Sequence, residues 1–79
     1  MKVEVRLFAT LAAYLPDGTR GDSVTLAVPD RTTVGDVIRS LGIPPHVSAI
    51  TVINGHDAGL EAALTDGDEL AMFPPLAGG

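Results

Sequence analysis

The 79-residue chain is large enough for one domain with a small core. Hydrophobic residues make up 46% of it and charged residues 19%, which is typical of a globular protein. It has no cysteine, which excludes a disulfide scaffold, a thiolate zinc site and a cysteine nucleophile and fits a cytoplasmic location. Its net charge of −5 would repel phosphate backbones, so nucleic acid is not an expected partner. No apolar stretch approaches the roughly 20 residues that span a bilayer, so no membrane association is expected.

The N-terminal third predicts two strands. Apolar and charged residues alternate from Lys2 to Leu7, as in a strand with one buried face. The Ala/Leu-rich segment 9–15 predicts a short helix that Pro16 ends. Alternation returns at 24–28 and predicts a second strand, joined to the first through a long loop.

One amphipathic helix follows. Thr33 is a suitable N-cap, and Asp36 three residues later completes a weak capping box. The apolar spacing i, i+3, i+4 and i+7 is filled by Val34, Val37, Ile38 and Leu41. Gly42 suits the left-handed position after the helix.

The remaining elements are short strands. Residues 49–53 are apolar and β-branched, and Asn54-Gly55 is a strong hairpin signal. A short return strand or turn is expected within 56–67, and a last strand at 69–73 that Pro74-Pro75 ends. One helix must then cover one face of one sheet. The prediction is an α+β, β-grasp (ubiquitin-like) roll with a mixed four- to five-stranded sheet over 1–73, followed by a flexible tail at 74–79.

The sheet carries more apolar residues than one face needs. The core face is predicted to hold Val3, Val5, Leu7, Val24, Leu26, Val28, Ile50, Val52, Leu70 and Met72. Alternation then sends Phe8, Ile53, Ala71 and Phe73 to the opposite face, where they would form an apolar binding patch. The alternative is a one-residue error in register, which would exchange the two faces.

Two clusters of polar residues are assigned no chemistry. His46 and His56 have no third ligand at metal spacing, so no metal site is expected. The acids Asp66, Asp68 and Glu69 crowd around Gly67 and are interpreted as a solvated turn. Together with Asp57 and Glu61 they could instead face a basic partner.

The C-terminal segment is chemically suggestive. Gly78-Gly79 has no Cβ atom, so its carboxylate could enter a channel too narrow for other residues. Pro74 and Pro75 would aim the segment away from the sheet. The alternative is a frayed end of small residues.

These residues carry a family resemblance. The run from Leu64 to Gly79, which contains Phe73-Pro74-Pro75-Leu76-Ala77-Gly78-Gly79, resembles the C-terminus of the MoaD/ThiS sulfur carriers, and the molybdopterin synthase small subunit most of all. Thr33 to Val37 and Val52 to Gly55 also match the family pattern. The loop 14–23 does not match the molybdopterin synthase pattern and is more similar to other carriers of the family.

The resemblance implies a carrier without catalysis of its own. An activating adenylyltransferase of the MoeB/ThiF kind would use ATP to adenylate the Gly79 carboxylate, and sulfur would then replace AMP to give a thiocarboxylate. No cofactor would be bound by the chain itself. In molybdopterin synthase the tail enters the large subunit, which supplies the catalysis for dithiolene formation. Gly79 would be the reacting residue with Gly78 next to it, and Phe73, Pro74, Pro75, Leu76 and Ala77 would form the docking stem. Phe8, on the predicted apolar face, would be a further partner-binding residue.

Other functions stay open. A carrier of the same family could supply sulfur for thiamine thiazole, cysteine or tRNA thiolation. A ubiquitin-like modifier would join Gly79 to lysines of target proteins. A plain interaction domain would end in Gly-Gly by chance and would tolerate a C-terminal extension.

Overall fold

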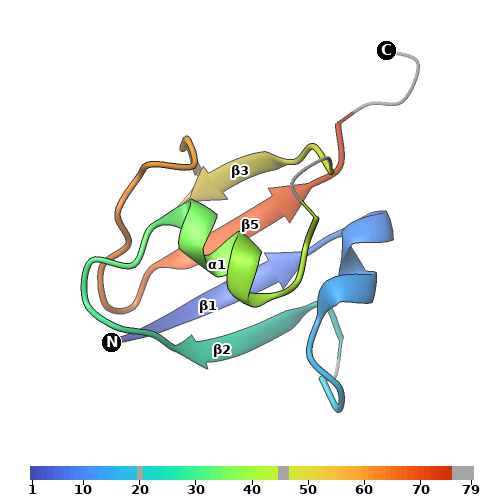
Figure 1. Cartoon of the computed structure of the whole chain (residues 1–79), viewed down its shortest axis with the longest axis horizontal. Coiled ribbons are helices and arrows are strands. Elements are labelled where there is room, and N and C mark those ends of the chain that lie inside the picture. The colour runs from blue at the N-terminus through green and yellow to red at the C-terminus, as the bar shows by residue number, and fades with distance from the viewer. Residues whose placement is uncertain (20, 45–46, 76–79) are drawn as a thin grey trace.

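The computed structural model describes residues 1–19, 21–44 and 47–75. In chain order the elements are β1 (Lys2–Leu7), η1 (Ala9–Tyr14), β2 (Ser23–Ala27), α1 (Val34–Ser40), β3 (Ile50–Ile53), β4 (His56–Asp57) and β5 (Glu69–Phe73). They form a five-stranded mixed sheet in the order β2-β1-β5-β3-β4. This confirms the predicted β-grasp, ubiquitin-like fold (Figure 1).

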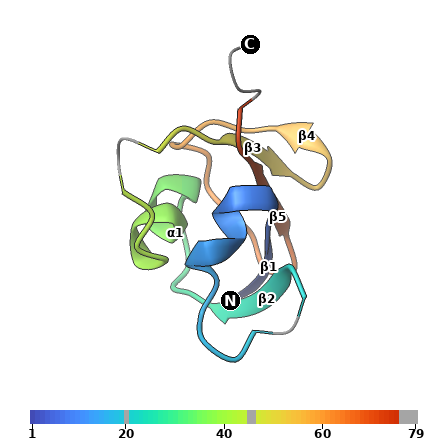
Figure 2. The same cartoon turned by 90° about the vertical axis from the view of Figure 1, so that its right-hand side faces the viewer.

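The two central strands run parallel to each other. β1 pairs with β5 in parallel, whereas the β1–β2, β3–β4 and β3–β5 pairs are antiparallel. Figure 2 shows α1 on one side of the sheet, while no helix of the described residues covers the other side. We call the side that faces α1 the core face and the opposite side the outer face. No helix within the described ranges is long and apolar enough to cross a membrane.

The core lies between α1 and the two central strands. Strand side chains from alternate positions fill it, and α1, η1 and two loops close it. The buried apolar residues are Val3, Val5, Leu7, Leu11, Val34, Val37, Ile43, Leu64, Leu70 and Met72. The predicted short helix is a 3-10 helix in the structure, and its Leu11 is buried.

The start of α1 is tied to a distant segment. The Thr33 hydroxyl accepts from the Asp36 N–H and the Asp36 carboxylate accepts from the Thr33 N–H, which is the predicted capping box. The next two free N–H groups, those of Val34 and Gly35, donate to the carbonyls of Ala62 and Leu60 at 3.0 and 2.9 Å. A Cβ at Gly35 would lie 3.2 Å from the Leu60 carbonyl oxygen, so a side chain there would push the two segments apart by a few tenths of an ångström.

The β3–β4 hairpin has the turn that its sequence predicts. Asn54 and Gly55 both take positive φ angles, 50° and 84°, as a type I′ turn requires. The return strand β4 is only two residues long, His56–Asp57. His56 is exposed there, and His46 lies outside the described residues.

The acidic turn at 65–68 joins three strands. Asp68 accepts from the Thr65 N–H at 2.8 Å and from the Asn54 amide at 2.9 Å, while Asn54 in turn accepts from the Glu69 N–H. Asp66 accepts from the backbone N–H of Lys2 at 2.7 Å. The interpretation of these acids as a solvated turn is therefore incomplete. Asp66 and Asp68 accept hydrogen bonds that tie the turn to the ends of neighbouring strands.

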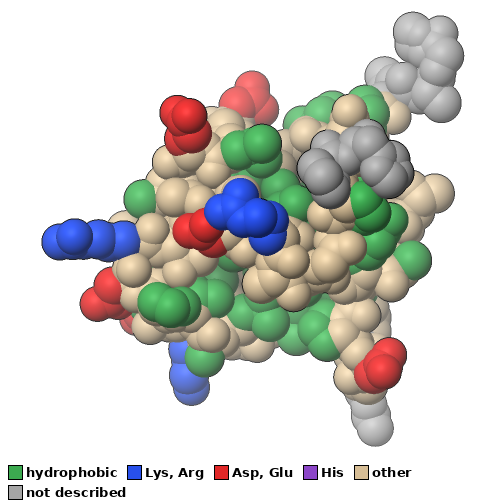
Figure 3. All heavy atoms as spheres, viewed as in Figure 1, with side chains coloured by type: hydrophobic (Ala, Val, Ile, Leu, Met, Phe, Trp, Pro, Cys, Tyr) green, Lys and Arg blue, Asp and Glu red, His purple; other side chains and the backbone are tan. Residues whose placement is uncertain are grey.

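The face that carries α1 is mixed in character. Figure 3 shows charged side chains of both signs scattered among hydrophobic ones over this face. Asp36 and Arg39 form an ion pair on α1 itself. Among the described residues on this side, charges of one sign do not gather into an extended area.

We predict that Asp68→Ala lowers the free energy of unfolding by about 1–3 kcal/mol, because two hydrogen-bond donors lose their acceptor. The bond from the Thr65 N–H, and then that from Asn54, holds the pKa of Asp68 below its usual range. Its contribution is therefore present above the unfolded-state pKa of about 3.9 and is lost as the pH falls through the lower folded-state pKa. Urea unfolding of both proteins between neutral and acidic pH measures this.

Asp17→Ala, in an exposed turn, is the matched control and should change stability little at any pH. An Asp68→Ala protein as stable as this control would contradict the role given to the turn.

Candidate functional site

The outer face of β3 differs from the prediction. Thr51 pairs with Met72 and Ile53 with Leu70, so both lie on the core face, whereas Ile50 and Val52 lie on the outer face. Thr51 is 7% exposed and Ile50 is 46% exposed. The placement of Ile50 and Val52 in the core, and of Ile53 outside it, was therefore wrong for this one strand. The outward placement of Ala71 and Phe73 was correct.

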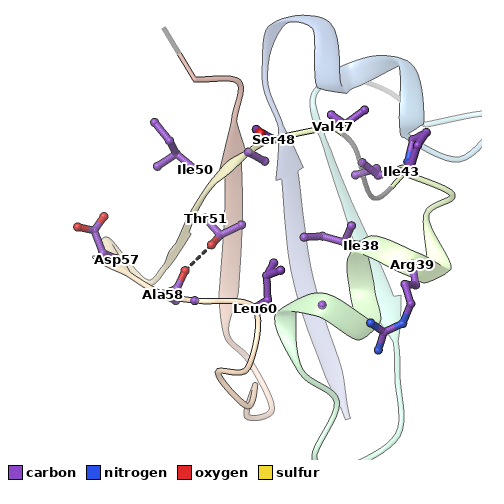
Figure 4. A pocket seen from close by; sticks show the side chains of 14 residues that line it. Ile38, Arg39, Ile43, Val47, Ser48, Ile50, Thr51, Asp57, Ala58 and Leu60 are labelled. Atoms are coloured by element: carbon purple, nitrogen blue, oxygen red, sulfur yellow. Dashed lines mark hydrogen bonds between the residues drawn. The ribbon is translucent and has the colours of Figure 1, made fainter. Parts of the chain in front are cut away.

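A hydrogen bond explains why a threonine is buried in place of an isoleucine. The Thr51 hydroxyl donates to the carbonyl oxygen of Ala58, beyond the hairpin (Figure 4). A buried hydroxyl that has a partner costs little, and its methyl group packs as an apolar group would. Ile50 points away from α1 in the same view.

Phe8 and Phe73 form an aromatic pair where β1 and β5 end. Their ring centroids lie 4.6 Å apart with an interplanar angle of 3°. The Phe8 N–H donates to the Met72 carbonyl at 3.1 Å, which continues the β1–β5 pairing by one residue and sets the two rings side by side. Phe73 is 37% exposed, so the pair presents a ring surface to solvent.

The pair belongs to a larger apolar area. Ile50 is the cross-strand partner of Phe73, and Val52 is the partner of Ala71 one step along. We call this area the outer-face patch; it consists of Phe8, Ile50, Val52, Ala71 and Phe73. Sequence reasoning found three of these five residues and missed Ile50 and Val52. An exposed apolar patch of this kind on an uncovered sheet face is typical of interaction surfaces.

The other half of the outer face is charged. The Arg6 Nε atom lies 3.3 Å from Glu4 and 3.6 Å from Glu69. The hydrogen bond to Glu4 and the charge of Glu69 hold the pKa of Arg6 above its usual value. The outer face along β1 and β5 is thus charged near the start of both strands. It is apolar near their end, where β5 leads into Pro74.

The chain leaves the sheet beside the patch. Pro74 and Pro75 follow Phe73 directly, and neither has an N–H to continue the ladder with a neighbouring strand. The structure places these two predicted site residues next to the aromatic pair. Leu76, Ala77, Gly78 and Gly79 lie outside the described residues.

A groove of about 810 Å³ lies elsewhere, between α1 and the segments 47–51 and 57–60 (Figure 4). Its lining is mainly apolar, with Ile38, Ile43, Val47 and Leu60 among its residues. Arg39 and Thr51 also line it, and both are bonded within the chain. The groove thus offers apolar surface and few unengaged polar groups to orient a small molecule.

A mixed five-stranded sheet with one helix across one face defines a β-grasp, ubiquitin-like protein. The family model described as "Mut7-C ubiquitin" matches residues 1–77, and the chain belongs to this family.

The chain is similar to small archaeal modifier protein 3 of Haloferax volcanii, with 35% identity and full coverage of both chains. It is also similar to the crystal structure of small archaeal modifier protein 1 from the same organism, with a TM-score of 0.76, 32% identity and full coverage of both. The complex of subunits 1 and 2 of the molybdopterin-converting factor from Helicobacter pylori shares the fold, with a TM-score of 0.63, 22% identity and full coverage of both chains. The findings favour the modifier alternative over the molybdopterin synthase subunit.

We predict that Ile53→Ala lowers the free energy of unfolding by about 1–2 kcal/mol, because Ile53 packs against the core. Ile50→Ala, the same substitution on the outer face, should stay within about 0.5 kcal/mol of the parent. Chemical unfolding of the two variants compares them. Equal losses, or a larger loss for Ile50→Ala, would contradict the face assignment of β3.

Proposed function

We propose that this chain is a ubiquitin-like protein modifier whose Gly79 carboxyl group is activated with ATP and joined to lysine amino groups of other proteins. The observation that carries the proposal is the full-length similarity to two proteins that are named small archaeal modifiers, at 35% and 32% identity. Both comparisons cover the whole chain and so extend over residues 78–79.

The chemistry needs activation before any transfer. A carboxylate is a poor electrophile, because its negative charge is delocalised over two oxygens. Reaction with ATP gives an acyl-adenylate at Gly79 and releases pyrophosphate. A lysine amine then attacks the carbonyl carbon, the bond to AMP breaks, and an isopeptide bond forms with loss of one proton. Glycine leaves that carbonyl without a side chain to shield it.

The outer-face patch would hold the activating adenylyltransferase. Its aromatic pair lies where the chain leaves the sheet. An enzyme bound to the patch would therefore lie beside Pro74, where the segment that leads to Gly79 begins. Between Phe73 and Gly79 there are six residue steps, which span about 20 Å when extended. That length would place an active site well away from the sheet surface.

A sulfur carrier is the second candidate. It is favoured by the resemblance of Phe73-Pro74-Pro75-Leu76-Ala77-Gly78-Gly79 to the end of the molybdopterin synthase small subunit. Here a sulfur nucleophile would displace AMP from the same adenylate, and the thiocarboxylate would deliver sulfur, in the molybdopterin case to a large subunit that the chain would dock on. The two functions share the activation step and differ only in what attacks Gly79.

We predict that Phe73→Ala weakens binding to the activating enzyme by about 30-fold or more, the factor that corresponds to about 2 kcal/mol for an aromatic hot spot. The fold should persist, because the lost stacking contributes only about 0.5–1.5 kcal/mol beyond area burial. Titration calorimetry and thermal melting measure the two effects.

Leu60→Ala is the matched control, since Leu60 is also exposed, at 58%, but lies next to α1 and away from the patch. Equal weakening by both variants would rule out a specific role for the patch.

We also predict that deletion of Gly79, Gly78→Val and an added C-terminal alanine each abolish conjugation in the presence of ATP and the activating enzyme. Each change moves or shields the reacting carboxyl group, and none should alter thermal stability, because the buried core of the described residues lies between Val3 and Met72. Intact mass separates the two candidates: conjugates to lysine indicate the modifier, and exchange of one oxygen for sulfur indicates the carrier. Full conjugation by the alanine-extended chain, without trimming, would overturn the assignment of the Gly79 carboxyl group as the reacting group.

A further inference from the structure

The chain has a single lysine. Lys2 is the only residue of the 79 with an ε-amino group, because the other four basic residues are arginines. Lys2 is exposed at the start of β1, and its neighbour Val3 is buried, so the Lys2 side chain lies on the outer face. If Gly79 is joined to lysines, as the proposed function states, this chain carries one such acceptor itself.

The backbone of Lys2 is held by hydrogen bonds, whereas its side-chain amine has no bonding partner among the described residues. The Lys2 backbone N–H donates to Asp66 at 2.7 Å, and its carbonyl accepts from the Gly67 N–H at 2.8 Å. Among the described residues, no ion pair or hydrogen bond holds the Lys2 ammonium group. An amine that is exposed on a rigid strand can approach an acyl group without opening the fold.

The Met1 amino group, the other amine, is in a different situation. It donates to the Val28 carbonyl at 2.9 Å and lies 3.9 Å from Asp30, and the Met1 side chain is only 6% exposed. The Val28 N–H in turn donates to the Met1 carbonyl at 2.8 Å, which holds the edge of β2 in place. Acylation at Met1 would remove the charge that faces Asp30 and would have to fit an acyl group beside the Val28 carbonyl, so Lys2 is the more accessible amine.

Lys2 and the exit of β5 lie at opposite ends of the sheet. Glu4 is level with Glu69 and Leu7 with Met72 in the parallel pair, so Phe73 lies about six residue steps, or roughly 20 Å, beyond Lys2. Figure 1 shows the N-terminus and the end of β5 on opposite sides of the molecule. Residues 74–79 would need to run back along the whole sheet to reach the Lys2 of the same chain, whereas a second copy can present its Lys2 directly.

We propose that Lys2 is the acceptor through which copies of this chain are joined to one another, by an isopeptide bond from the Gly79 carboxyl group of one copy to the Lys2 amine of the next. This inference rests on the proposed function. The activating enzyme and ATP supply the Gly79 adenylate; the Lys2 nitrogen attacks its carbonyl carbon, AMP leaves, and the nitrogen loses a proton. With one acceptor per copy, the product is an unbranched head-to-tail chain with a single type of linkage.

The first test uses the full-length protein, its activating enzyme, ATP and free lysine as an added acceptor. The wild type should give a ladder of linked copies on a denaturing gel as well as a monomer carrying one added lysine. Lys2→Arg, which keeps the charge, should give no ladder but the same lysine adduct and the same melting temperature. Chymotrypsin, which cuts after leucine, should leave Ala-Gly-Gly from residues 77–79 attached to Lys2.

A ladder that persists in Lys2→Arg would overturn the inference, as would a lysine adduct in the wild type without any ladder. A wild-type monomer joined to its own Lys2, seen as loss of one water without a change in size, would overturn the head-to-tail arrangement.

The second test separates this inference from the proposed function. A protein with a chemically prepared Gly79 thioester needs no enzyme and, when concentrated at mildly alkaline pH, should form dimers joined at Lys2. Such dimers without any product in the enzymatic reaction would uphold Lys2 as the acceptor and refute the proposed function. A thioester protein that links through Met1, or not at all, would refute Lys2.

Discussion

The parallel pairing of β1 with β5 is the constraint on which the rest of the structure depends. It joins the first and last strands of the chain, so the sheet closes only after nearly the whole sequence is present. A parallel pair of such sequence separation has a high entropic cost of closure. The bonds from Lys2 to Asp66, from Gly67 to Lys2 and from Glu4 to Asp68 offset part of this cost at the start of the pair, while the Phe8–Met72 bond extends it at the far end.

The same pairing creates the candidate site. Phe8 and Phe73 stack because a parallel register brings two residues 65 positions apart to the same level, and Ile50 joins them because β3 pairs with β5 on its other side. The aromatic surface and the point where the chain leaves the sheet therefore cannot separate. A partner that bound the patch would find Pro74, where the chain leaves the sheet, at a fixed place beside it.

Most of the fold could be predicted from local pattern. The alternation in β1, the Thr33–Asp36 capping box and the Asn54-Gly55 turn each depend on neighbours in sequence, and each is found in the structure. The orientation of β3 could not be predicted, because Ile50, Val52 and Ile53 are apolar on both faces and the burial of Thr51 depends on Ala58 across the hairpin. Ile50 and Val52 were missed at the site for this reason, whereas Phe8, Phe73, Pro74 and Pro75 follow from regular alternation and from chain order.

Pro74 and Pro75 have a consequence for the free energy of recognition. A strand that continued past Phe73 with ordinary residues could extend its ladder along β1 or β3, and presenting it to an enzyme would first require those hydrogen bonds to break. Two consecutive residues without N–H groups prevent that competing state from forming. An enzyme bound to the patch would therefore not need to break ladder hydrogen bonds at Pro74 and Pro75, which have no N–H to donate.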